Sequence, residues 1–248
     1  MKETYDIIKF TLSEREYYQR FPDEHYIEQV ERFKKYFPNK TADEERKTSE
    51  EKYDNYLEID IPMGCSRIGG PIVDLPKDIE YPESYYFMGQ INCAEVKPFD
   101  KIGLLPEKGF IYFFVSDDLE NGYVFYTDKG KEYLHRVTKE HENCYYSGKM
   151  IEKCKMETET ISSRYELENG NKEWDYFAGE EISKIYGIYT NCQAGEEEIL
   201  QFMEDENKII LLQIGSDYAG EGCQSVSINK DDLVKKDFTK CIFEYNQS

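Results

Sequence analysis

Few residues in this sequence have the types and spacing that catalysis requires. Gly64-Cys65-Ser66 places a thiol beside a hydroxyl, but either nucleophile needs a general base within reach. The chain contains three histidines, His25, His135 and His141, and none stands in a recognisable motif with the nucleophile pair. Hydrolase, zinc-protease and nucleotide-loop motifs are absent from the sequence. We therefore predict no catalytic residue.

A metal site is the second chemistry to consider. His135, His141 and Cys144 lie close in sequence, with Glu140 or Glu142 as a further oxygen ligand. Their spacing matches no standard zinc pattern, and the stretch is polar and solvated. We predict no metal and no cofactor.

An acidic loop offers a weaker metal pattern. Asp117–Gly122 has the glycine of a calcium loop, but Leu119 occupies a ligand position. A plain acidic turn before a hairpin is the better interpretation, because Asn121-Gly122 is a hairpin signal.

Four polar residues remain as candidates for ligand binding: Arg67, Lys184, Gln90 and Gln213. Arg67 and Lys184 each stand near flexible glycine backbone, where a cation can hold an anion. The alternative, which we favour, is that each pairs with a nearby carboxylate. The two glutamines follow apolar strands, so they either bond the backbone at strand ends or contact a ligand.

These candidates belong to a stretch that occurs twice. Ser66–Pro76 begins Ser-Arg-Ile-Gly-Gly, and Ser183–Gly187 repeats it as Ser-Lys-Ile-Tyr-Gly. Matching residues are separated by 113 to 123 positions, as Ser66 and Ser183, Gln90 and Gln213, Gly109 and Gly222, and Asp117 and Asp231 show. Offsets that change by a few residues at loops indicate two repeats, at about 60–130 and 183–248.

Hydrophobic patterning predicts mostly strands after residue 53. The expected strands cover residues 56–61, 85–91, 109–115, 123–126, 133–137, 156–161 and 209–214. Ser225–Leu233 lines up with Ile111–Leu119, and both segments end in Asp-Asp-Leu. Glu196–Met203 is a helix candidate with acids in its first turn. Strands joined by short connections, with few helices, indicate an α+β fold that is β-rich and antiparallel.

The first part of the chain has a different pattern, which predicts helices. Ser13–Glu16 is a capping-box pattern, and Pro22 favours the start of a second helix. An apolar stripe at helical spacing predicts a packing face, with the members Tyr26, Ile27, Val30, Phe33 and Phe37. We predict a helical N-terminal extension with a charged, mobile connector over residues 1–52, and one domain of two repeats over 53–248.

The chain is strongly acidic, with 31 basic and 51 acidic side chains and a net charge of −20. Residues 1–60, 61–130, 131–182 and 183–248 carry −5, −5, −4 and −6, so the charge is spread evenly. Such a surface repels nucleic acid and anionic membranes and is compatible with a basic protein partner. Seven scattered cysteines without a CxxC pair, and no signal-peptide core, predict reduced thiols and a cytoplasmic protein.

Ordered blocks of the sequence resemble the YwqG-like proteins, a bacterial family of unknown function. The blocks are Ser66–Gly70, Gly89–Asn92, Leu105–Phe114, Leu211–Asp217 and Asp232–Phe238, and the resemblance covers about residues 60–248. It implies a mixed, β-rich fold and no assigned activity. Members of the family are found near bacterial toxin–immunity loci, which implies an immunity or interaction role by association.

The sequence thus predicts a cytosolic binding protein, for example an immunity-type inhibitor of a bacterial toxin. The alternative is a small-molecule sensor or an enzyme with a pocket between the two repeats. In that case Arg67 and Lys184 would both point into the pocket.

Overall fold

The fold centres on a ten-stranded sheet in which every strand pairing is antiparallel. We analysed a computed structural model, which describes all residues except 1–3, 141–146, 162–163, 175–177, 221 and 248. The strand order is β16-β15-β14-β13-β1-β10-β4-β6-β7-β8. This strand-rich architecture confirms the predicted α+β class with antiparallel sheet.

Two long strands form the middle of the sheet, β1 (Thr4–Leu12) and β10 (Lys149–Thr160). They pair along nearly their whole length, from Thr4 opposite Thr160 to Leu12 opposite Ile151. Four strands continue the sheet beyond β10: β4 (Arg67–Ile68), β6 (Tyr86–Asn92), β7 (Phe110–Val115) and β8 (Gly122–Thr127). Four others continue it beyond β1: β13 (Lys184–Tyr186), β14 (Lys208–Ile214), β15 (Cys223–Asn229) and β16 (Ile242–Asn246). We call the strands β4, β6, β7 and β8 the first arm of the large sheet. The strands β13, β14, β15 and β16 are its second arm.

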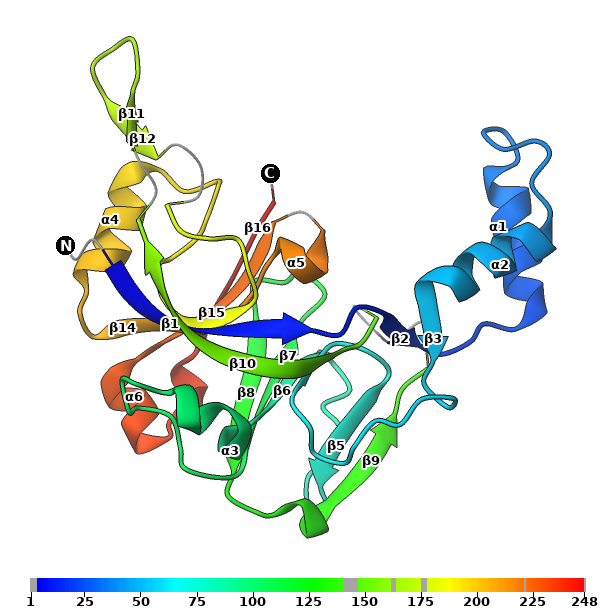
Figure 1. Cartoon of the computed structure of the whole chain (residues 1–248), viewed down its shortest axis with the longest axis horizontal. Coiled ribbons are helices and arrows are strands. Elements are labelled where there is room, and N and C mark those ends of the chain that lie inside the picture. Colours follow the sequence, from blue (N-terminus) through cyan, green and yellow to red (C-terminus); the bar gives the residue numbers. More distant parts are fainter. Residues whose placement is uncertain (1–3, 141–146, 162–163, 175–177, 221, 248) are drawn as a thin grey trace.

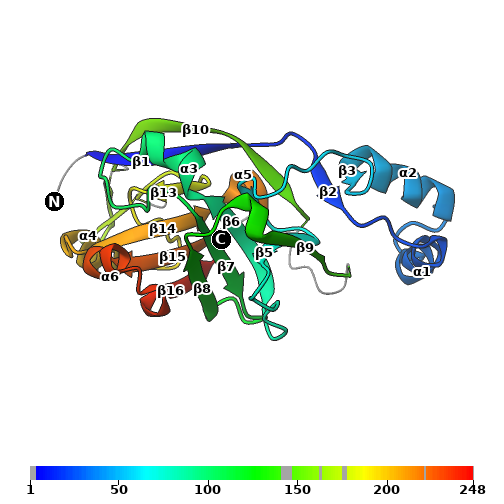
Figure 2. The same cartoon turned by 90° about the horizontal axis from the view of Figure 1, so that it is seen from below.

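The two arms of the sheet pack against each other (Figure 2). One apolar cluster contains Ile68 and Val115 from the first arm together with Leu212 and Val226 from the second. Near the sheet edges, a Cβ on Gly122 would overlap the ring of Phe243. The main core of the protein therefore lies between the arms.

Separate layers cover the outer face of each arm. The strands β5 (Ile72–Pro76) and β9 (Leu134–Thr138) pair with each other and bury Val73 and Leu134 against Phe87 and Tyr112. The helix α4 (Glu196–Glu204) buries Ile199 and Phe202 on the second arm. The remaining short elements are α3 (Cys93–Val96), 3₁₀ turns at 97–99, 131–133 and 238–240, β11 (Arg164–Glu166), β12 (Lys172–Trp174), α5 (Ser216–Ala219) and α6 (Lys230–Lys235).

A pair of helices projects from the side of this sheet (Figures 1 and 2). The short strands β2 (Glu16–Tyr18) and β3 (Tyr53–Asn55) pair in parallel at its base. Between them run α1 (Asp23–Phe33) and α2 (Ala42–Lys52). We call residues 22–52 the helical arm.

The expected helical N-terminus is correct only from Pro22 onward. Residues 4–12 form the central strand β1 and residues 16–18 form β2, so the predicted helix after Ser13 is wrong. Instead, the Ser13 hydroxyl donates to the Arg15 carbonyl at 3.0 Å. The β-branched and aromatic residues of 4–12 find strand partners on both sides, and this tertiary context overrides a local capping pattern.

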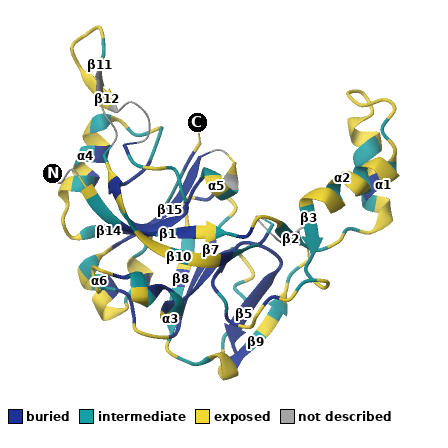
Figure 3. Ribbon diagram, viewed as in Figure 1, coloured by how far each residue is buried: buried dark blue, intermediate teal, exposed yellow. Residues whose placement is uncertain are grey.

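Two further expectations about this region are corrected. Residues 39–52 are no mobile connector, because Thr41 and Glu44 form a capping box that begins α2. The apolar stripe of α1 buries Tyr26 but leaves Ile27, Phe33 and Phe37 exposed (Figure 3). The predicted packing face is therefore mostly unpartnered.

The strands predicted at 85–91, 109–115, 123–126, 133–137 and 209–214, and the helix at 196–203, are confirmed to within two residues. The strand predicted at 156–161 is longer, since β10 begins at Lys149. The strand predicted at 56–61 is wrong, because this segment is a turn. Tyr56, Ile59 and Ile61 pack against Tyr17 and Ile72, but Leu57 is 74% exposed. The alternating residues Leu57, Ile59 and Ile61 therefore do not share one buried face.

Two glycines at equivalent places in the arms lack room for a side chain. Gly109 and Gly222 have φ of +88° and +80°, and a Cβ on either would overlap a carbonyl oxygen, that of Thr127 or Asn246. We predict that Gly109→Ala and Gly222→Ala each lower the free energy of unfolding by more than about 2 kcal/mol, because strain at positive φ adds to the clash.

Urea unfolding followed by circular dichroism measures this effect. Gly195→Ala is the matched control, since nothing lies within 4 Å of its added Cβ, and it should change stability by less than about 1 kcal/mol. Equal small effects for all three variants would contradict the packing at the two arms.

Candidate functional site

Arg67 lies on the outer side of the first arm, fully buried beneath β5. Its neighbour Ile68 faces the core between the arms, and successive strand residues point to opposite faces. The Arg67 guanidinium forms an ion pair of 2.7 Å with Asp74, and both side chains are 0% exposed. Its Nε also donates to the Ile72 carbonyl at 3.3 Å.

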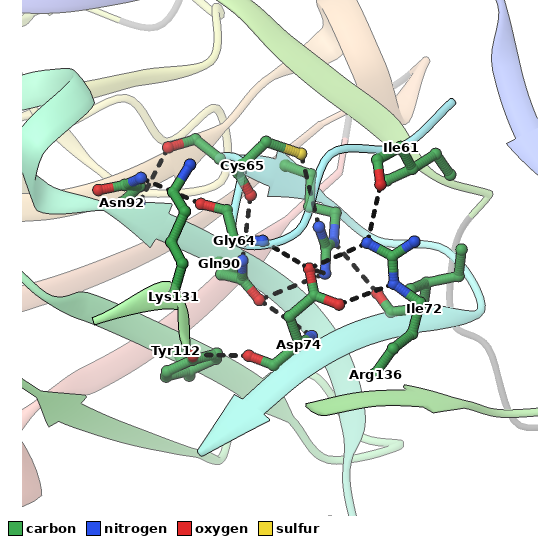
Figure 4. A network of polar contacts seen from close by, with 12 residues as sticks. Ile61, Gly64, Cys65, Ile72, Asp74, Gln90, Asn92, Tyr112, Lys131 and Arg136 are labelled. Atoms are coloured by element: carbon green, nitrogen blue, oxygen red, sulfur yellow. Dashed lines mark hydrogen bonds and ion pairs between the residues drawn. The ribbon is translucent and has the colours of Figure 1, made fainter. Parts of the chain in front are cut away.

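Asp74 collects donors from several segments (Figure 4). Arg136 of β9 donates to its two oxygens at 2.8 and 3.2 Å, and the Gly64 amide donates at 2.8 Å. Burial alone would raise the pKa of this carboxyl. The hydrogen bond from Arg136 and the charge of Arg67 outweigh burial, so the pKa of Asp74 lies below its usual value and the group stays ionised.

Gln90 completes this first network on β6. Its amide oxygen accepts from Arg67 at 3.4 Å and from the Asp74 backbone amide at 3.2 Å, while its nitrogen donates to the Cys65 carbonyl at 3.1 Å. The Tyr112 hydroxyl donates to the Asp74 carbonyl at 2.6 Å. The network thus ties β4, β5, β6, β7 and β9 together. The hydrogen bonds and ion pairs of its side chains are formed with other groups of the same chain.

A second network surrounds Lys184 on the outer side of the second arm. The ammonium of Lys184 bonds a carboxylate oxygen of Glu159, a residue of β10, and both side chains are 0% exposed. It also donates to the carbonyls of Glu180 and Ile188 at 3.1 and 3.3 Å. Burial lowers the pKa of Lys184, and the opposing charge of Glu159 limits this shift.

Gln213 stands opposite Lys184 in the ladder, as Gln90 stands opposite Arg67. Its amide nitrogen donates to the carbonyls of Glu180 and Ile182 at 3.1 and 2.9 Å. Each arm therefore begins with a buried cation, a glutamine across from it and a carboxylate from another strand.

The serines before the two cations behave alike. The hydroxyl of Ser66 accepts from the Asn92 amide at 2.9 Å, and that of Ser183 accepts from the Gly215 amide at 3.2 Å. Their own amides donate to acids, Glu95 in one case and Asp217 in the other, each at 2.9 Å.

The structure brings the predicted site residues together in pairs. Arg67 meets Gln90, and Lys184 lies with Gln213 on the carbonyl of Glu180. It does not bring the two pairs to each other, because the apolar core fills the space between the arms. The favoured alternative, pairing of each cation with a carboxylate, is what the geometry shows.

Sequence reasoning missed three members of these networks: Asp74, Arg136 and Glu159. Asp74 had a signal, since an acid inside the apolar run Ile72–Leu75 must be paired when buried. Glu159 had none, because the other side chains of β10 are mostly exposed. Arg136 had none either, because its own side chain is partly exposed and nothing in its local sequence marks a buried partner.

The described residues show little of the geometry that a metal site or a calcium loop would require. Within the part of the chain that the structure describes, no three His, Cys, Asp or Glu side chains are grouped to hold a metal. His141, Glu142 and Cys144 lie outside the described residues. The acidic turn before β8 is confirmed, with Asp118 accepting from the amides of Glu120 and Asn121.

Several cysteines are poor nucleophiles. Burial raises the pKa of Cys93, Cys154 and Cys241 to about 12 in each case, so these thiols stay protonated at neutral pH. The six cysteines described by the structure are free thiols.

A known family model matches most of the chain. The sequence model of DUF1963, a domain of unknown function, matches residues 66–246, which is 181 of 248 residues. The chain belongs to this family. No curated protein matches it. The matched segment includes the paired cations, carboxylates and glutamines of both networks, whereas β1, the helical arm, Gly64 and Cys65 precede it.

The family match agrees with the expected membership in a family without an assigned function. Among the described helices, none is long and apolar enough to cross a membrane.

The first network generates a stability prediction. Asp74→Ala leaves the Arg67 guanidinium buried without its carboxylate, which should cost about 3–5 kcal/mol of unfolding free energy. The control is Asp6→Ala, which breaks the exposed ion pair with Lys101 and should cost less than about 1 kcal/mol. Chemical denaturation of both variants makes the comparison, and similar small losses would show that the buried pair is dispensable.

The same carboxyl predicts a pH dependence. Its folded-state pKa is lowered, so its contribution is present above the unfolded value of about 3.9 and is lost as pH falls through the folded value. The stability gap between wild type and Asp74→Ala should therefore be constant from pH 7 to about 5 and narrow at lower pH. Urea titrations across this range test it, and a gap unchanged at the lowest pH would refute the assignment.

Proposed function

We propose that this protein is a non-enzymatic binding protein that recognises a basic protein partner through an acidic surface around α4. The observation that carries the proposal is the charge of residues 196–206. This segment holds six acids and no base: Glu196, Glu197, Glu198, Glu204, Asp205 and Glu206.

Helix stability does not explain all of these acids. Glu196–Glu198 in the first turn of α4 interact favourably with the helix dipole, but Glu204 and Asp205 lie at its C-terminal end, where negative charge opposes the dipole. Ile199 and Phe202 hold the other side of the helix in the core. Glu204 and Asp205 therefore have an unfavourable local position and are exposed, which favours a role in recognition.

A surface hollow beside α4 supplies a place for a basic group. It has a volume of about 710 Å³, and its charged lining residues are four glutamates and one lysine: Glu173, Glu196, Glu197, Glu204 and Lys172. An excess of carboxylates around a hollow steers a basic partner and makes association fast and salt-sensitive.

The buried networks support a binding role over an enzymatic one. Arg67 and Lys184 are each neutralised by a buried carboxylate and hold backbone carbonyls. The alternative of a sensor or enzyme with a pocket between the repeats receives less support, because apolar side chains occupy that region.

We also infer that the two arms derive from a duplicated unit, as the repeat pattern in the sequence indicates. Support comes from the matching ladder positions of Arg67–Gln90 and Lys184–Gln213. Positive φ at Gly69 and at Tyr186, its counterpart in the second repeat, adds to this: the angles are 57° and 66°.

We extend the proposal to the family, the compartment and the partner of the protein. We place the protein among the YwqG-like bacterial proteins, acting in the cytoplasm as an immunity-type inhibitor of a toxin. The free thiols are consistent with a reducing compartment. A neighbouring gene that encodes a toxin-like C-terminal domain would supply the partner to test.

A charge-matched pair of variants tests the acidic surface. Glu197→Gln/Glu204→Gln/Glu206→Gln removes three exposed acids from it, and Glu14→Gln/Glu80→Gln/Glu120→Gln removes three exposed acids elsewhere. With the purified product of the neighbouring gene, the first variant should lose at least about tenfold in association rate and show a weaker salt dependence.

The second variant should bind almost as well as wild type, and both should keep the wild-type circular dichroism. Equal effects of the two variants would show that net charge alone matters. No binding of the purified gene product by wild type at low salt would overturn the proposed partner.

A further inference from the structure

The turn at the end of the helical arm has a charge opposite to that of the rest of the chain. Residues 32–40, Arg-Phe-Lys-Lys-Tyr-Phe-Pro-Asn-Lys, contain four cations and no acid. Subtracting this +4 from the net charge of −20 leaves −24 for the remainder. We call residues 32–40 the arm tip.

Three aromatic side chains of the arm tip are exposed. Phe33, Tyr36 and Phe37 are 43%, 69% and 58% exposed. They lie where α1 ends and the chain turns, beyond the point where Tyr26 anchors the helix. Large apolar side chains gathered at one exposed turn indicate a contact surface.

The cations of the arm tip stand beside these rings. Arg32 lies 5.5 Å from the ring centre of Phe33, Lys35 lies 5.8 Å from that of Tyr36, and Lys40 lies 5.8 Å from that of Phe37. Acids from neighbouring segments pair with two of the cations, since Lys34 bonds Glu31 at 2.8 Å and Lys40 bonds Glu45. Among the described residues, no carboxylate forms an ion pair with Arg32 or Lys35.

The position of the arm tip favours a partner with a flat, deformable surface. It lies at the end of the helical arm away from β2 and β3, where the chain projects from the sheet (Figure 1). A projecting turn has no groove of its own, so a protein partner would need a matching concave surface. A bilayer interface needs none, because aromatic rings settle at the headgroup level and cations meet lipid phosphates.

Distance separates the arm tip from the acidic sheet. The helix α1 has 11 residues, which corresponds to a length of about 16 Å. The Debye length at physiological ionic strength is about 8 Å. The negative charge of the sheet is therefore largely screened at the arm tip and does not cancel the attraction of its cations to an anionic surface.

We propose that the arm tip binds the surface of an anionic lipid bilayer, with Phe33, Tyr36 and Phe37 in the headgroup region and the cations at lipid phosphates. This goes beyond the proposed recognition of a basic partner by α4 and does not depend on it. The proposal replaces the expectation of no membrane partner. That expectation rested on charges summed over segments of 52 to 70 residues, and such sums conceal a basic segment of nine residues.

Vesicle flotation with the full chain tests the proposal. Phosphatidylcholine vesicles with and without phosphatidylglycerol are compared at about 0.1 M salt and about 1 M salt, where the Debye length falls from about 10 to 3 Å. We expect binding only to the vesicles that contain phosphatidylglycerol, with most of it lost at high salt.

Three variants separate the contributions. Phe33→Ser/Tyr36→Ser/Phe37→Ser keeps the charge, and Arg32→Gln/Lys34→Gln/Lys35→Gln keeps the rings. Each should lower the bound fraction at least about tenfold. The control, Lys47→Gln/Lys77→Gln/Lys153→Gln, removes three exposed cations from other places and should bind like wild type. Circular dichroism and thermal melting confirm that each variant is folded.

Three results would overturn the proposal. The first is no flotation of wild type with anionic vesicles, and the second is equal loss in the tip and control variants. The third is concentration-dependent association of wild type in light scattering that the tip variants abolish while vesicle binding is absent. That result would assign the arm tip to the acidic surface of a second copy.

Discussion

A buried cation paired with a buried carboxylate fixes the first strand of each arm of the sheet. Arg67 of β4 pairs with Asp74 of β5, and Lys184 of β13 pairs with Glu159 of β10. An unpaired charge in either place would be severely unfavourable, so each strand has one position in which its cation is neutralised. A shift of either strand by one residue would also turn its cation into the apolar core, so the ion pairs and the core select the same register.

This arrangement separates structure from recognition. The ion-paired groups bond one another and the backbone, and the apolar core fills the space between the arms. Unbalanced charge is left to the surface, with acids around α4 and cations at the arm tip. The matched family segment contains both arms of the sheet and the ion pairs of their networks, while the helical arm precedes it. The matched part of the chain and its projecting part can therefore serve different partners.

The sequence predicted the fold best where pattern and tertiary partner agree. Strands β6, β7 and β14 are apolar runs that are buried on both sides, and their period and length identified them. It failed for β1, whose partner β10 lies more than a hundred residues away and has a polar sequence. No local pattern reports such a pairing.

The candidate site was predictable in part for the same reason. The repeated Ser-cation-Ile pattern pointed to Arg67 and Lys184, and the ladder places a glutamine opposite each. Their carboxylate partners come from β5 and β10, which occupy different positions relative to the two arms. The second repeat therefore offered no copy of Asp74 to find, and Glu159 became visible only in three dimensions.

Residue-resolved hydrogen exchange under native conditions tests most directly whether the buried pairs are structural locks. The amides of Gly64 and Ile188 donate to the paired carboxylates Asp74 and Glu159, each at 2.8 Å. If the pairs hold the arms in register, both amides should exchange only through global unfolding, with the same free energy as the core of β7. Exchange of either amide through a local opening of much lower free energy would contradict this account and would leave the cation accessible to a ligand.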